Sequence, residues 1–155
     1  MSYKVVIVSK MDFGYRAVLE KEGKIPPTDI IEAKSVDEAV STLDDLVSRG
    51  SDIGAIIHNL DVTLDRNKQF SRLMLNVKAK HPTVPVIVIS IYDSKQPVLN
   101  KDLSVRQPEM SVAEALVREG VYAHVPIDVE PDVLIGWVRS ALQEHSYRLE
   151  KSGHT

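Results

Sequence analysis

A short apolar run in the middle of the chain limits the folds that this sequence can adopt. Residues 52–61 read Asp-Ile-Gly-Ala-Ile-Ile-His-Asn-Leu-Asp. The run is too short for an ordinary helix and does not alternate between apolar and polar residues, so it predicts a strand buried on both faces. Because sites in open parallel sheets lie beyond the carboxyl ends of the strands, His58, Asn59 and Asp61 mark the first candidate site.

Strand-like and helical patterns alternate along the rest of the chain. The predicted strands share a short length and an apolar, β-branched composition: residues 3–8, 29–33, 52–61, 84–91 and 121–125. The predicted helices carry apolar residues at helical spacing: residues 14–22, 35–50, about 67–80, 111–120 and a last helix from 131. With right-handed crossovers, this order predicts an α/β fold with a five-stranded, doubly wound parallel sheet, a flavodoxin-like (βα)5 sandwich.

Local signals define the ends of several of these elements. Ser35 with Glu38, and Ser111 with Glu114, form capping boxes in which the serine accepts from the glutamate amide and the glutamate carboxylate returns to the serine amide. In the last helix, Trp137 shares helical spacing with apolar neighbours, which predicts a core position.

The chain reads as one domain over residues 1–150, followed by a frayed tail at 151–155. The polar stretch at 92–110, with Pro97 and Pro108, is longer than most connections in compact domains. It fits either a disordered insertion or a loop that docks a partner.

Composition excludes several classes of function. The 19 basic and 22 acidic residues are interspersed, which argues against nucleic acid as a partner. The absence of cysteine excludes disulfides and thiolate sites. No run is long and apolar enough for a membrane span and the start does not resemble a signal peptide, so we expect a soluble, cytoplasmic protein.

The sequence also lacks the motifs of common enzymes. No glycine-rich loop follows a predicted strand, and there is no Gly-x-Ser-x-Gly elbow. We therefore expect no catalytic residue, no resident metal and no cofactor.

The strand-end motifs resemble those of the receiver domain of two-component response regulators. The motifs are residues 52–58, the Val-Ile-Val-Ile-Ser run ending at Ser90, and Gly-Val-Tyr-Ala-His-Val-Pro at 120–126. The resemblance covers about residues 4–143. In the receiver pattern, position 58 would be the phosphorylated aspartate and position 125 a lysine. The same pattern implies a switch hydroxyl at Ser90 and a switch aromatic at Tyr122.

The departures from the receiver pattern fall on the residues that carry its chemistry. The acidic pair that would hold Mg²⁺ is Ser9-Lys10, and hard cations require oxygen ligands. The nucleophile position is His58, or Asn59 if the register shifts by one residue, and the lysine position is Val125. Metal ligands, nucleophile and cation are missing together, which predicts a pseudo-receiver that cannot be phosphorylated on aspartate.

The resulting site prediction is a degenerate phosphoacceptor pocket. Its members are Ser9, Lys10, His58, Asn59, Asp61, Ser90 and Val125, with Ser90 and Tyr122 as switch-like residues. One alternative for this pocket is that Lys10 replaces the metal's charge and pairs with Asp12 or Asp61.

The resemblance implies a phosphorylation-independent signalling or protein-interaction module. Its output surface would be the fourth helix, the fifth strand and the last helix, through which receiver domains commonly dimerise. Arg118, Glu119, Arg139 and Glu144 mark that surface, and the partner would be another protein or a second copy.

Two alternatives stay open. The chain also resembles the receiver-like N-terminal wing domain of bacterial ornithine, lysine and arginine decarboxylases, which would give it a noncatalytic role in assembly. Otherwise, His58 and His124 with the loop aspartates Asp12, Asp61 and Asp65 would make a flavodoxin-like domain that binds a small ligand or a metal.

Overall fold

The computed structural model describes residues 3–60, 66–90, 97–99, 106–111 and 120–152. Its main sheet has five parallel strands in the order β2-β1-β3-β4-β7. These strands are β1 (Lys4–Val8), β2 (Ile30–Ala33), β3 (Ile53–Leu60), β4 (Val86–Ser90) and β7 (Ala123–Pro126). The predicted doubly wound parallel sheet is confirmed.

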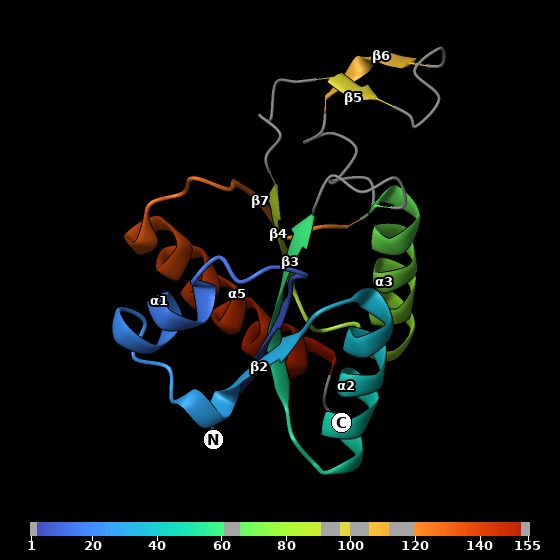
Figure 1. The fold of residues 1–155 in the computed structure, drawn as a ribbon. Coiled ribbons are helices and arrows are strands. Elements are labelled where there is room, and N and C mark those ends of the chain that lie inside the picture. The colour runs from blue at the N-terminus through green and yellow to red at the C-terminus, as the bar shows by residue number, and fades with distance from the viewer. Residues whose placement is uncertain (1–2, 61–65, 91–96, 100–105, 112–119, 153–155) are drawn as a thin grey trace.

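Helices cover both faces of the sheet (Figure 1). One face carries α2 (Val36–Ser48) and α3 (Arg66–Lys80), and the other carries α1 (Tyr15–Lys21) and α5 (Pro131–Ser152). A short 3-10 helix, Pro27–Asp29, precedes β2. All eight residues of β3 are buried, because this strand is central and covered on both faces.

Side chains of β3 alternate between two apolar core layers. Ile56 and Leu60 belong to the layer under α2 and α3, together with Phe70. Ile57 belongs to the layer under α1 and α5, together with Leu134. The alternation decides which polar residue at the end of β3 faces which side.

Helix α5 packs closely on β3. A Cβ atom on Gly54 would lie 2.6 Å from both Leu142 Cδ2 and Tyr3 Cβ, so only glycine fits there. Further along α5, His145 is 1% exposed; its Nδ1 lies 3.1 Å from Thr83 O and its Nε2 3.1 Å from Asp52 Oδ1. These contacts anchor α5 to the loops that precede β3 and β4.

The capping box at the start of α2 differs from its prediction in one bond. The Glu38 amide donates to Ser35 Oγ at 3.0 Å, as expected. The Glu38 carboxylate, however, accepts from the Lys34 amide at 2.8 Å, one residue before the serine. Ser111 ends a strand, and the helix predicted after it, at 112–119, lies outside the described residues.

The stretch at 92–110, predicted to be irregular, contains a short antiparallel pair of strands, β5 (Pro97–Leu99) and β6 (Arg106–Ser111). This pair forms a separate two-stranded sheet (Figure 1). The prolines argued against strands, but both members of a two-stranded ladder are edge strands, where proline is tolerated.

The last helix extends further toward the C-terminus than predicted. Helix α5 continues to Ser152, so Lys151 and Ser152 are helical and do not belong to a frayed tail. None of the helices in the described ranges combines the length and the apolar character that crossing a bilayer requires.

Replacing Gly54 with alanine should destabilise the fold by about 1–3 kcal/mol, because the added methyl group overpacks the α5–β3 contact. Urea unfolding measures the change. Gly136→Ala is the matched control, since nothing lies within 4 Å of a Cβ there and alanine suits a helix better. Equal stability of Gly54→Ala and the parent would contradict the close packing.

His81 should make the fold less stable in mild acid. Burial lowers its pKa below the ordinary value of 6.5; Asp44 raises the pKa and Lys80 lowers it. The unfolded chain therefore binds a proton more readily, so stability is fully present above pH 6.5 and falls as the pH drops below it. Urea midpoints measured between about pH 8 and 5 should fall less steeply in His81→Gln, and parallel curves would contradict this account.

Candidate functional site

The carboxyl ends of β1, β3, β4 and β7 meet at one edge of the sheet, because the strands are parallel and in register. Val8 is paired with His58 on β3. His58 is paired with Val88, which in turn is paired with His124 on β7. The predicted pocket residues therefore lie along one edge, but they do not all face the same side.

Asn59 is the β3 residue that lies beside the loop after β1. Its side chain is buried, and Nδ2 donates to Ser9 Oγ at 3.3 Å. The Ser9 hydroxyl in turn donates to the carbonyl oxygen of Met11, and the Ser9 amide donates to Ala33 O at 2.9 Å. An amide and a hydroxyl thus occupy the region where the receiver pattern places carboxylates.

His58 points to the other side of the sheet. Its ring stacks on Phe70 of α3, with centroids 5.7 Å apart and planes 21° apart. The sequence motif placed the phosphoacceptor at position 58, but the residue facing Ser9 is its neighbour Asn59. The reason is the two-residue period of a strand, in which one step of register changes the face.

Ser90 is fully buried at the end of β4, and its Oγ lies 2.7 Å from His124 Nε2. The histidine tautomer decides which atom donates. Val125, at the position of the expected lysine, is 1% exposed and belongs to the apolar layer under α1 and α5.

Tyr122 and Ser90 form hydrogen bonds to different residues. The Tyr122 hydroxyl pairs with Ser140 Oγ of α5, and the Tyr122 ring lies edge-on to Trp137, with centroids 6.2 Å apart. Ser90 bonds to β7, whereas Tyr122 packs with the layer under α1 and α5. The two switch-like residues therefore have separate surroundings.

The metal alternative finds no support in the part of the chain that the structure describes. Within it, no three His, Asp or Glu side chains are grouped closely enough to hold a metal ion. Asp12 accepts from the Gly14 amide at 2.8 Å, which fixes the turn into α1. Asp61 and Asp65 lie outside the described residues.

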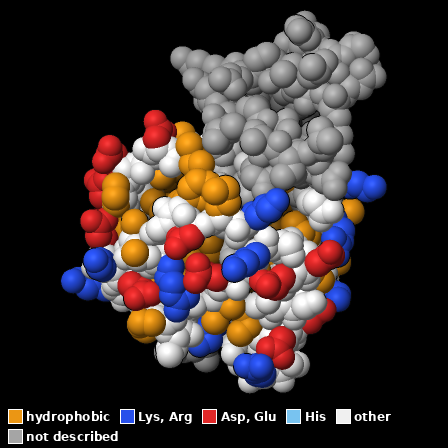
Figure 2. Space-filling model, viewed as in Figure 1, with side chains coloured by type: hydrophobic (Ala, Val, Ile, Leu, Met, Phe, Trp, Pro, Cys, Tyr) orange, Lys and Arg blue, Asp and Glu red, His pale blue; other side chains and the backbone are white. Residues whose placement is uncertain are grey.

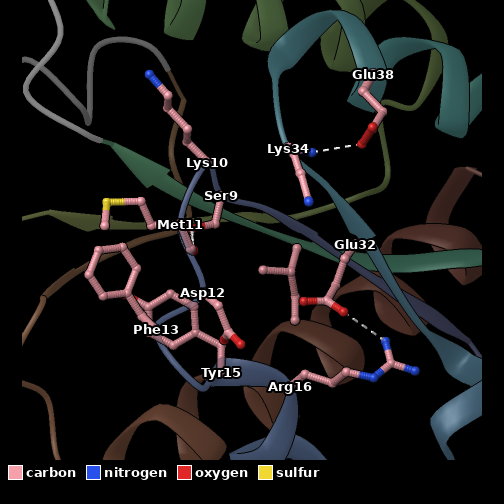
Figure 3. Close-up of a pocket in the computed structure, with 11 residues that line it drawn as sticks. Ser9, Lys10, Met11, Asp12, Phe13, Tyr15, Arg16, Glu32, Lys34 and Glu38 are labelled. Carbon is pink, nitrogen blue, oxygen red and sulfur yellow. Dashed lines mark hydrogen bonds and ion pairs between the residues drawn. The ribbon is translucent and has the colours of Figure 1, made fainter.

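Lys10 does not pair with Asp12, one of the two partners considered for it. It is exposed, and its ammonium points away from Asp12 (Figure 3). An exposed ammonium stays solvated and needs no buried partner. Asp61, the other expected partner, lies outside the described residues.

A pocket of about 210 Å³ lies next to this loop, between α1, β2 and the start of α2 (Figure 3). Arg16 of α1 lines it and bonds Ile30 O at 2.8 Å, Pro27 O at 3.0 Å and the Glu32 carboxylate at 3.3 Å. Tyr15, at the same wall, is buried, and this burial raises the pKa of its hydroxyl to about 12. Sequence reasoning missed Arg16, because an arginine on an exposed helix face carries no distinctive signal.

Of the four residues predicted to mark the output surface, the structure describes two, Arg139 and Glu144. Arg118 and Glu119 lie outside the described residues. Arg139 lines a groove between α1 and α5 that Glu22 also lines, while Glu144 is paired with Arg148 at 2.8 Å on α5. Helical spacing puts Glu144 on the flank of Trp137 and Arg139 on another side, so the two do not mark one face.

Trp137, which was predicted to lie in the core, is exposed, and so is Val133 on the same helix. Val133 is 46% exposed and Trp137 is 39% exposed. The apolar face of α5 that packs on the sheet is instead formed by Leu134, Ile135, Val138 and Ala141. Figure 2 shows basic and acidic side chains interspersed over the visible described surface.

Comparison with known proteins shows the fold. No protein-family model matches the sequence, and no curated protein matches it either. Among solved structures, the signal receiver domain of a protein named as a Luxo repressor from Vibrio parahaemolyticus is 16% identical, with a TM-score of 0.69 over 99% of this chain and 100% of that chain.

Two further structures agree. A CheY-like response regulator receiver domain protein from Methanospirillum hungatei JF-1 is 15% identical, with a TM-score of 0.65 over 95% of this chain and 99% of that one. NtrX from Brucella abortus, in complex with ADP, is 20% identical, with a TM-score of 0.67 over 98% of this chain and 29% of that one. The chain has the fold of receiver domains.

Removing the Arg16 side chain should loosen the wall of the pocket. Arg16→Ala loses hydrogen bonds to two backbone carbonyls and ion pairs with two carboxylates, those of Glu20 and Glu32, which should lower the free energy of unfolding by about 1–3 kcal/mol. Urea unfolding measures it, with Lys21→Ala on the same helix as the control. A loss no larger than that of the control would show that these bonds contribute nothing to stability.

Proposed function

We propose that this chain is a receiver-like signalling domain that acts through protein contacts, without phosphorylation on aspartate. The observation that carries the proposal is the hydrogen bond between Asn59 Nδ2 and Ser9 Oγ, 3.3 Å long, at the carboxyl ends of β3 and β1. It joins two uncharged groups at the place where a receiver would need a nucleophile beside metal ligands.

The three groups that a receiver uses for phosphoryl transfer are a carboxylate nucleophile, Mg²⁺ ligands and a cation, and other residues stand at each of these positions. A carboxylate is needed as nucleophile, and the Asn59 amide has no comparable reactivity. Mg²⁺ binds through carboxylate and other oxygens, and a Ser9-Lys10 pair puts an ammonium in place of a carboxylate. A cation would pair with the phosphoryl oxygens, and Val125 is an apolar core residue.

The fold supports the signalling part of the proposal. Solved receiver domains share the fold of this chain. Fold alone does not determine function, so the proposal depends on the strand-end residues and on an accessible contact surface on α5.

An amide NMR titration with Mg²⁺, followed by beryllofluoride, tests the loss of the chemistry. Beryllofluoride mimics an aspartyl phosphate only where a carboxylate and a cation are present. We expect no saturable shifts at Ser9, Asn59, Ser90 or Tyr122, because the β3 residue that contacts Ser9 is Asn59, an amide and not a carboxylate. Saturable shifts at these amides would overturn the proposal.

A variant that restores acidic groups gives the matched positive control. Ser9→Asp combined with Asn59→Asp places two carboxylates at neighbouring positions, because Ser9 and Asn59 are in direct contact. This variant should show Mg²⁺-dependent shifts at the strand ends that the parent chain does not show.

A further inference from the structure

The cavity of about 210 Å³ that Arg16 lines extends to the other side of β1 from Asn59. Strand β1 lies between β2, at the wall of this α1–β2 pocket, and β3, which carries Asn59. The lining includes Ile7, a core residue that is 2% exposed, while Met11 and Phe13 at the rim are 64% and 43% exposed. Pockets for drug-sized ligands measure roughly 300–1,000 Å³, so this smaller cavity fits a small metabolite.

Local contacts hold the walls of the α1–β2 pocket in place. Asp12 accepts from the Gly14 amide at 2.8 Å, and Gly14 has a φ of 80°, which glycine adopts readily, so the chain turns sharply into α1. Arg16 joins α1 to β2 through the Ile30 carbonyl oxygen and the Glu32 carboxylate. The pocket is therefore formed by the fold itself, as most small-molecule sites are.

The Tyr15 hydroxyl is a hydrogen-bonding group that the fold leaves unsatisfied. Tyr15 lines the pocket and is 6% exposed, and its hydroxyl oxygen has no hydrogen-bond partner among the described residues. Burial raises the pKa of Tyr15 to about 12, so the hydroxyl keeps its proton at neutral pH and can donate it. Buried polar groups are nearly always hydrogen-bonded, which indicates that a ligand supplies the acceptor.

Two opposite charges at the rim line the pocket without pairing. The Lys34 ammonium and the Asp12 carboxylate form no ion pair within the part of the chain that the structure describes. Lys34 extends from the end of β2 toward the Glu32 carboxylate (Figure 3). A ligand with one negative and one positive group satisfies Lys34 and Asp12 together, whereas a simple anion or cation leaves one of them unpaired.

The other charged residues of the lining are already engaged or point into water. Arg16 forms an ion pair with Glu32 at 3.3 Å. The Glu38 carboxylate accepts from the Lys34 amide at 2.8 Å, and Lys10 is exposed. One cation and one anion are therefore left for a ligand.

We propose that the α1–β2 pocket binds a free α-amino acid with an apolar side chain. The carboxylate of the amino acid pairs with Lys34 and accepts from the Tyr15 hydroxyl, and its ammonium pairs with Asp12. Its side chain covers the exposed Met11 and Phe13 at the rim. This site goes beyond the proposed function and does not depend on it.

An amide NMR titration of the full chain with L-leucine, L-methionine and L-phenylalanine tests the site. At least one of them should give saturable shifts at Lys34 and over residues 9–15. For the amino acid that binds most tightly, two analogues test the charge requirement: its amide, which keeps only the positive charge, and its deaminated acid, which keeps only the negative charge. Each analogue should bind at least about fivefold more weakly, because one charge of the protein stays unpaired.

Tyr15→Phe separates a ligand site from a structural role. It should weaken binding at least about tenfold and leave the ligand-free chain as stable to urea as the parent or more stable, because it removes an unpaired buried hydroxyl. Lys34→Gln and Asp12→Asn should each weaken binding at least about fivefold, and the asparagine keeps an oxygen for the Gly14 amide. Lys21→Gln, on the same helix but outside the lining, is the matched control that should bind like the parent.

Four results would overturn the inference. The first is the absence of saturable shifts with all three amino acids, and the second is an amide or deaminated analogue that binds as tightly as its amino acid. The third is a Tyr15→Phe variant that binds like the parent. The fourth is a control, Lys21→Gln, that loses as much affinity as Lys34→Gln.

Discussion

The close contact between α5 and the central strand is the constraint on which the rest of the structure depends. Gly54 lets the helix approach β3, and His145 fixes its C-terminal half to Asp52 and Thr83 O. Because α5 is held in this orientation, its apolar side covers the sheet, while Trp137 and Tyr147 stay exposed. The same strand, β3, carries Asn59 to the site.

The fold was predictable because its signals are periodic and local. Buried strands appear as apolar runs, and the Ser35 cap marks the start of α2. The site was less predictable, because a strand alternates its faces at every residue. Motif spacing chose His58, whereas contact with Ser9 belongs to Asn59. No sequence signal could separate these two adjacent polar residues.

Errors about exposure have a similar origin. Helical spacing grouped Trp137 with the core residues of α5. Only one side of a helix packs on the sheet, however, and an apolar residue at the edge of that side can remain exposed. A replacement of a metal's charge by Lys10 was one alternative, yet Lys10 is exposed to water, where an unpaired ammonium is stable. Which side chains leave the core depends on tertiary packing, which periodicity alone does not contain.

Together, these features describe a receiver-like fold whose strand ends are joined by side-chain hydrogen bonds. Asn59 with Ser9 holds β3 to the loop after β1, and Ser90 with His124 joins β4 to β7. The hydroxyl of Tyr122, at the aromatic position of the receiver pattern, is paired with Ser140 of α5. An assembly role in a larger decarboxylase remains a prediction, and it too would use contact surfaces in place of catalysis.

The most direct measurement is the intact mass of the full chain after incubation with acetyl phosphate and Mg²⁺. The account predicts an unchanged mass, because Asn59, the β3 residue in contact with Ser9, carries an amide in place of a carboxylate nucleophile. A chain heavier by one phosphoryl group, with the modification mapped to a residue at the carboxyl end of β3, would contradict it.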